Sequence, residues 1–95
     1  MILVRIVFHA HHGKINQLVE GMKRASQDAP VRPVILTDLS GRMETMVLET
    51  RHASLAAYEQ WRVELFKSRA FQESQAQGAG LIESGSTEFY TIEQA

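Results

Sequence analysis

The chain opens with a run in which almost every side chain is apolar. Residues 2–8 are rich in β-branched side chains, and Arg5 alone interrupts them. A short run of this kind is typical of a central β-strand that is covered on both faces. Its even positions are all apolar, whereas its odd positions include Arg5 and lead on to His9. Both faces of this strand therefore need cover, and one cover can be less apolar than the other.

The spacing of side chains predicts two helices. Between residues 15 and 25, apolar side chains recur three and four positions apart, which is the pattern of a helix with one apolar face. They are Ile15, Leu18, Val19, Met22 and Ala25. A second helix starts after Ser54, a residue type that commonly caps helices. Its buried side is expected to carry Leu55, Tyr58, Trp61, Arg62 and Leu65.

Three further strands are predicted, at residues 34–37, 42–50 and 87–92. Pro30 and Pro33 stop the first helix and redirect the chain before the first of them. Residues 38–41 form a turn in which Gly41 can adopt a positive φ, so the second and third strands make a hairpin. A break at residues 68–69 and a short extra turn over 70–77, ending at residues 78–80, follow the second helix. Leu81 and Ile82 are expected to anchor a loop before the last strand.

The order of elements is therefore β-α-β-β-α-β, the ferredoxin-like α+β arrangement. Residues 1–95 fit one such domain, with a four-stranded antiparallel sheet and both helices on one face. The right-handed crossover rule places the third strand between the first and second, and the fourth outside the first. The helices cover one face, yet the first strand is apolar on both. The simplest remedy is a second copy packed sheet to sheet with two-fold symmetry.

Composition and charge narrow the function classes. Ten Lys and Arg against eleven Asp and Glu give a formal net charge of -1, so there is no electrostatic case for nucleic-acid binding. The chain has no cysteine, which excludes disulfides, thiolate metal sites and cysteine nucleophiles. No apolar run approaches the roughly 20 residues that a membrane helix needs, and the first residues lack the basic leader of a signal peptide. A cytoplasmic protein without a cofactor is expected.

Histidines cluster where the first strand meets the first helix. His9 and His11 lie two residues apart and would project to one face of an extended strand, a spacing that metal ligands use. Glu44, at the start of the neighbouring third strand, can add a carboxylate, and the amides at the helix start can hold an anion. No third histidine stands at a recognisable spacing. A polar loop at the rim of the protein is therefore preferred to a metal or anion site.

Arg5 places a charge in the middle of a central strand, where it must be paired or reach water. The antiparallel neighbour offers Glu49 within diagonal reach. An Arg5–Glu49 pair that sets the register of a dimer interface is preferred to a substrate clamp.

Several stretches carry a resemblance to a known superfamily. Residues 41–49 read GRMETMVLE, residues 54–61 read SLAAYEQW, residues 66–73 read FKSRAFQE, and the last strand closes on Glu88, Phe89 and Tyr90. Together they resemble the dimeric α+β barrel superfamily, in particular NIPSNAP-like proteins and antibiotic-biosynthesis-type monooxygenases. The resemblance covers essentially the whole chain. It implies a homodimer whose two sheets form a barrel, and a pocket in each protomer between sheet and helices. Haem-degrading members use a histidine, an asparagine and a tryptophan there, but that triad does not align with this chain.

The candidates for such a pocket are His9, His52, Tyr58, Trp61 and Tyr90, since Tyr and Trp combine an apolar body with a polar atom. The preferred prediction is a NIPSNAP-like small-molecule binding or stress-related module. The alternative is a cofactor-independent monooxygenase or isomerase for a small aromatic substrate, with His9 or His52 moving a proton. A third interpretation has the interior filled by its own side chains. An unpaired histidine in the pocket favours the enzyme, whereas a purely apolar lining favours binding.

Overall fold

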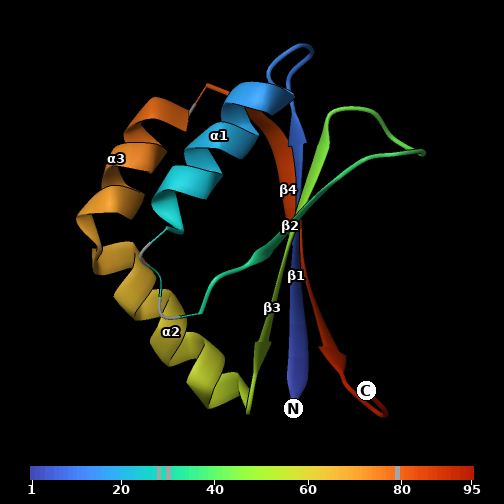
Figure 1. The fold of residues 1–95 in the computed structure, drawn as a ribbon, viewed down its shortest axis with the longest axis vertical. Helices are drawn as coiled ribbons and strands as arrows, with labels where there is room; N and C mark the ends of the chain where they lie inside the picture. Colours follow the sequence, from blue (N-terminus) through green and yellow to red (C-terminus); the bar gives the residue numbers. More distant parts are fainter. Residues whose placement is uncertain (28, 30, 79) are drawn as a thin grey trace.

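The computed structural model consists of one antiparallel sheet with helices on one side only (Figure 1). The strands are β1 (Ile2–Ala10), β2 (Val34–Thr37), β3 (Thr45–His52) and β4 (Ile82–Thr91), and the helices are α1 (Ile15–Ala25), α2 (Leu55–Lys67) and α3 (Arg69–Gly78). The structure describes residues 1–27, 29, 31–78 and 80–95, without the side chains of residues 70, 71, 74, 75 and 77. The expected contributions of Pro30 and Ala79 therefore lie outside the described residues.

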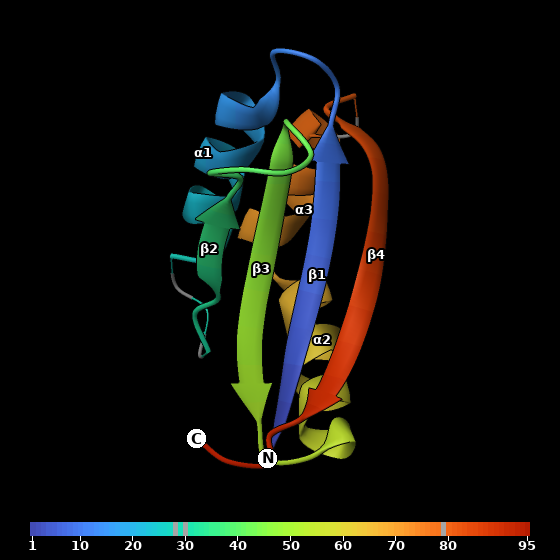
Figure 2. The same cartoon turned by 90° about the vertical axis from the view of Figure 1, so that its right-hand side faces the viewer.

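The strand order is β2-β3-β1-β4, as the crossover rule predicts, and every neighbouring pair is antiparallel (Figure 2). β1 is the central strand and pairs along its length with β3 on one side and β4 on the other. The ferredoxin-like α+β fold is thereby confirmed. No helix within the described part of the chain is long and apolar enough to cross a bilayer.

The helix-covered face of the sheet holds the core. Val4 of β1 and Met46 of β3 are completely buried there. Met46 forms a cluster of buried residues with Ala10, Leu18 and Leu48, and the apolar stripe of α1 packs against it. Alternation along β1 sends the even positions to this face and the odd positions, Arg5 included, to the opposite one. We call the face without helices the open face.

Local signals set the helix ends. Ser54 is the N-cap of α2, and its Oγ accepts a hydrogen bond from the Ala57 N–H at 3.1 Å. α2 stops at Ser68, whose extended backbone separates it from α3, as the predicted break requires. At α1 no cap comes from the helix's own residues. The Glu44 carboxylate accepts instead from the N–H groups of Gly13 at 3.0 Å and Ile15 at 3.1 Å.

The starts of two strands differ from the prediction. β3 begins at Thr45, and residues 38–44 form a loop that leans out on the open side of the sheet (Figure 1). Gly41 has φ +86° as expected, but Glu44 also has a positive φ, of 61°, which interrupts strand geometry just before Thr45. β4 begins at Ile82, which is therefore a strand residue and not a loop anchor. The first half of β4 is mostly exposed and polar, so the sequence there lacks the apolar alternation that predicts a strand.

Candidate functional site

A cavity of about 780 Å³ lies between the sheet and the helices. Its floor is the helix-covered face of the sheet, and the described floor residues are Ile6, Phe8, Leu48, Ile82 and Thr87. α1 contributes Leu18 and Met22, and α2 contributes Tyr58, Trp61 and Leu65. A volume of this size and an apolar lining are typical of small-molecule sites.

Helical periodicity explains which side chains reach the cavity. On α2, Tyr58, Trp61 and Leu65 stand three and four residues apart, so they share one face of the helix. On α1, Leu18 and Met22 are four residues apart and likewise point to the sheet side. The polar residues of the described lining come from the helices apart from Thr87, and they are Asn16, Gln17, Glu20, Arg24 and Arg62. The floor of the cavity is therefore apolar apart from Thr87, and polar side chains of the helices form its rim.

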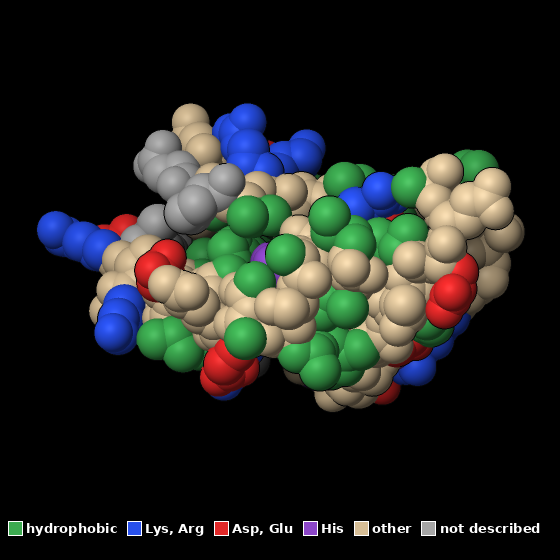
Figure 3. Space-filling model, turned by 90° about the horizontal axis from the view of Figure 1, so that it is seen from below, with side chains coloured by type: hydrophobic (Ala, Val, Ile, Leu, Met, Phe, Trp, Pro, Cys, Tyr) green, Lys and Arg blue, Asp and Glu red, His purple; other side chains and the backbone are tan. Residues whose placement is uncertain are grey.

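Four rings form an aromatic cluster where β3 runs into α2. The His52 ring lies 5.3 Å from the rings of both Tyr58 and Trp61, measured between centroids. Tyr58 in turn meets Trp61 at 6.0 Å and Phe89 of β4 at 5.5 Å, the latter edge to face. The view onto this end of the molecule shows hydrophobic side chains over much of the surface, with histidine visible only between them (Figure 3). Of these four rings, Tyr58 and Trp61 line the cavity, and His52 and Phe89 pack against them.

Burial decides the protonation of this cluster. His52 is 6% exposed, and its Nε2 lies 2.9 Å from Thr50 Oγ1. Desolvation lowers the pKa of His52 below its ordinary value of 6.5, so the folded protein holds a neutral imidazole near neutral pH. Burial likewise raises the pKa of Tyr58 and keeps its hydroxyl protonated. The indole N–H of Trp61 is buried and has no hydrogen-bond partner among the described residues.

The pKa shift of His52 predicts a pH dependence of stability. Because the unfolded chain binds this proton more readily than the folded one, His52 lowers the free energy of unfolding as pH falls through 6.5. We expect the melting temperature to drop between about pH 7.5 and pH 5.5, and the drop to be smaller in His52→Gln. Thermal melts followed by circular dichroism at the two pH values test this. Equal drops in parent and variant would contradict it.

The structure separates the predicted pocket residues into two groups. Tyr58 and Trp61 line the cavity, and His52 packs behind them without belonging to the described lining. His9 and Tyr90 lie on the open face, because both occupy positions of β1 and β4 that alternate away from the helices. His9 Nδ1 lies 3.1 Å from Thr45 Oγ1. The structure therefore does not bring His9 or Tyr90 to this cavity.

His9, His11 and Glu44 do not form the expected arrangement, in which both histidines share one strand face beside the carboxylate. β1 ends at Ala10, and the strand register shifts between His9 and Ala10, so the alternation that would align the two histidines is broken. The Glu44 carboxylate does reach the start of α1, where it occupies the place that an external anion would take. Among the described residues, no three His, Cys, Asp or Glu side chains gather into a metal site.

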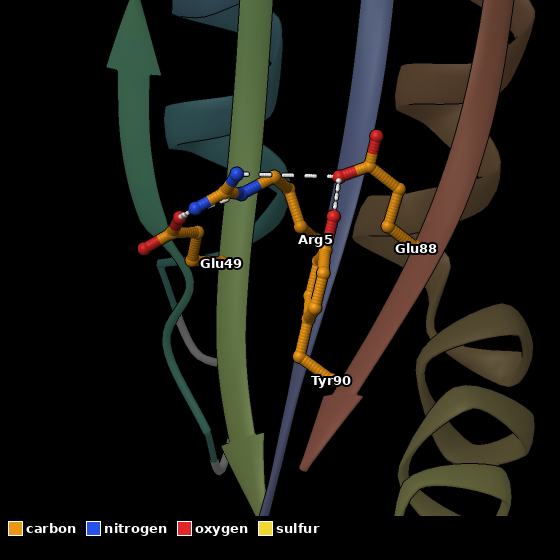
Figure 4. Close-up of polar contacts among 4 residues, drawn as sticks. All are labelled: Arg5, Glu49, Glu88 and Tyr90. Atoms are coloured by element: carbon orange, nitrogen blue, oxygen red, sulfur yellow. Dashed lines mark hydrogen bonds and ion pairs between the residues drawn. The ribbon is translucent and has the colours of Figure 1, made fainter. Parts of the chain in front are cut away.

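On the open face, Arg5 joins a polar network with three neighbours (Figure 4). Its Nη2 lies 2.7 Å from Glu49 Oε2, and its Nη1 lies 4.0 Å from Glu88 Oε1. Glu88 also accepts a hydrogen bond from the Tyr90 hydroxyl at 2.8 Å. The hydrogen bond to Glu49 raises the pKa of Arg5, and the bond to Glu88 raises that of Tyr90. Glu49 stands directly opposite Arg5, rather than diagonal to it as the sequence analysis expected.

The sequence prediction of the site leaves out Phe89, Thr50 and Arg24. Phe89 completes the aromatic cluster from β4, and alternation with the outward-facing Glu88 and Tyr90 is the signal that could have placed it there. Thr50 holds the His52 ring, and its position two residues earlier on the same strand face is the corresponding signal. Arg24 at the rim carries no sequence signal, since a charge near a helix end is ordinary.

The comparisons with known proteins show a shared fold. A NIPSNAP domain protein from Burkholderia xenovorans is 16% identical, with a TM-score of 0.81 over 96% of this chain and 93% of its own. A NIPSNAP family protein from Agrobacterium tumefaciens is 15% identical, with a TM-score of 0.84 over 95% of this chain and 90% of its own. No family model matches the sequence, and no curated protein matches it at a significant level.

A third structural neighbour has a provisional enzyme name. It is a protein from Nitrosomonas europaea named provisionally as an antibiotic biosynthesis monooxygenase, and it is 12% identical to this chain. The TM-score is 0.77 over 99% of this chain and 100% of the other. Both groups of neighbours are those that the sequence resembles, and at these identities the likeness shows the ferredoxin-like architecture alone.

Proposed function

We propose that this protein is a small-molecule binding module that holds a mostly apolar ligand between its sheet and its helices. The observation that carries this proposal is the cavity of about 780 Å³ with its apolar floor. The described side chains leave this space open, which speaks against an interior filled by its own side chains. Tyr58 and Trp61 add aromatic ring surface to the lining from α2, and aromatic rings pack well against an apolar ligand.

Binding of phenylnaphthylamine, a neutral apolar amine that fluoresces in apolar surroundings, tests the proposal. We expect saturable binding of one molecule per protomer, together with quenching of Trp61, the only tryptophan of the chain. Thr87→Phe narrows the cavity from β4 and should weaken binding by about tenfold, since an added ring must displace ligand volume. Thr91→Phe is the matched control, because Thr91 lies on the same face of β4 outside the described lining.

Two results would overturn the proposal. The first is the absence of saturable fluorescence up to the solubility limit of phenylnaphthylamine, with Trp61 emission unchanged. The second is equal weakening by Thr87→Phe and Thr91→Phe, which would place the bound molecule outside the cavity.

A cofactor-independent monooxygenase or isomerase is the second candidate, and the fold shared with the Nitrosomonas protein supports it. For that chemistry the available imidazole beside the cavity is His52, which burial keeps neutral and therefore able to accept a proton. Its Nε2 is engaged by Thr50, and the ring lies behind Tyr58 and Trp61. Binding is therefore preferred. Oxygen consumption in the presence of a bound aromatic substrate, lost in His52→Gln, would establish the monooxygenase instead.

The proposal includes a cytoplasmic homodimer packed through the open face. Val34 and Leu36 of β2 are 56% and 41% exposed on this face. The loop over residues 38–44 adds Leu39 and Met43, which are 102% and 70% exposed. Monomeric proteins rarely leave contiguous apolar surface of this kind in water. The Arg5 network at the centre of the face would set the register of the two copies. A nucleic-acid partner is not part of the proposal, given the net charge of -1.

A further inference from the structure

We propose, on the basis of the binding function above, that the ligand is an organic acid with an apolar body and a single anionic group, and that Arg24 binds this group. The inference rests on the charges at the rim of the cavity. Three charged side chains belong to the described lining, and they are Glu20 and Arg24 of α1 and Arg62 of α2.

Two of these three charges are already paired. Arg62 makes a bidentate contact with Glu59. Its Nη2 donates to Glu59 Oε1 at 2.8 Å, and its Nε donates to Glu59 Oε2 at 3.1 Å. Glu20 lies 3.4 Å from the ammonium group of Lys23. Arg24 has no counter-ion among the described residues. Once the pairs are set aside, the described part of the rim therefore carries one unmatched positive charge.

The position of Arg24 suits an elongated ligand that carries its charge at one end. Arg24 stands one helical turn beyond Glu20 and two turns beyond Asn16, so the three residues follow one side of α1. Arg24 is exposed, whereas the floor beneath includes Ile6 and Leu48 and is apolar. A ligand that lies with its apolar part on the floor and its anionic group at the rim keeps the apolar part out of water and leaves the charge in contact with Arg24 and solvent. The guanidinium group can bind a carboxylate or sulfonate through two parallel hydrogen bonds.

Two fluorescent compounds with the same ring frame isolate the charge. Anilinonaphthalene sulfonate is anionic and phenylnaphthylamine is neutral, so their difference in affinity reports on the anionic group. We expect Arg24→Gln to weaken binding of the sulfonate by about tenfold or more, because a charge-assisted hydrogen bond is lost. Binding of the neutral amine should change by less than about twofold. Arg24→Lys keeps the charge and should retain most of the affinity for the sulfonate.

Arg69→Gln is the matched control. It removes the same charge from a side chain that is 92% exposed and outside the described lining, and it should leave both affinities unchanged. Melting curves of each variant establish that it is folded. If Arg24→Gln weakens both compounds equally, or neither, the anionic ligand class is wrong while the binding function stands. If neither compound binds the parent protein, the binding function itself fails, and the ligand class with it.

Discussion

Replacing Arg5 with glutamate is expected to convert the proposed homodimer into a 10.7 kDa monomer at micromolar concentration. Arg5 lies 2.7 Å from Glu49 and 4.0 Å from Glu88, so the substitution leaves three carboxylates side by side at the centre of the open face. Covering them with a second sheet would remove three like charges from water without a partner. We expect the dissociation constant of the dimer to rise by at least about thirtyfold, measured by sedimentation velocity over a dilution series.

A charge swap separates the interface from a general loss of stability. Arg5→Glu combined with Glu49→Arg rebuilds the pair in reverse between the same two strands and should recover part of the association. Circular dichroism establishes that each variant keeps its fold. An unchanged sedimentation coefficient for Arg5→Glu would remove the open face from the interface. A 10.7 kDa species for the parent protein would remove the dimer altogether.

Met46→Ala is expected to lower the free energy of unfolding by about 2–5 kcal/mol. Met46 is 0% exposed and lies at the centre of the core cluster, between the sheet and α1. Its loss removes apolar contacts and leaves space that the surrounding strands cannot close, since β3 is paired on both sides. For a domain of this size the melting temperature should fall by roughly 8–40 °C, at about 4–8 °C for each kcal/mol. Urea unfolding and thermal melts measure both quantities.

Leu55→Ala provides the comparison for Met46→Ala. It removes an apolar side chain of similar size that is 60% exposed at the start of α2. We expect the free energy of unfolding to change by less than about 0.5 kcal/mol. Equal destabilisation by the two substitutions would mean that the cluster around Met46 is not the main core of the protein.

The sequence predicts the central elements of this fold well and its edges less well. The nearly continuous apolar run of β1 and the apolar stripe of α1 are strong signals because both elements place side chains in the same core. The start of β4 at Ile82 escapes the pattern, since Glu83 and the following serines belong to an exposed edge and bury nothing. The start of β3 is displaced to Thr45, because Glu44 has a positive φ, and the Glu44 carboxylate bonds to the distant amides of Gly13 and Ile15. No local pattern encodes such a contact.

The site divides in a similar way. Tyr58 and Trp61 are predictable because helical spacing places them on the face of α2 that meets the sheet. His9 and Tyr90 are predicted in the same pocket on their residue type alone, but strand alternation places both on the open face. The cavity itself depends on how far the helices stand from the sheet, and a single sequence gives no measure of that distance.

The hydrogen bonds of the Glu44 carboxylate also couple the start of α1 to β3, two parts of the chain that would otherwise open separately. Its carboxylate bonds span 31 residues to Gly13 and 29 residues to Ile15. Glu44 directly precedes β3, and β3 pairs with β1 over eight residue pairs. The first turn of α1 is therefore completed only when the β1–β3 ladder has formed, and peeling β3 away exposes that turn. We therefore expect hydrogen exchange at the Gly13 and Ile15 amides to follow the opening of the sheet rather than the fraying of the helix.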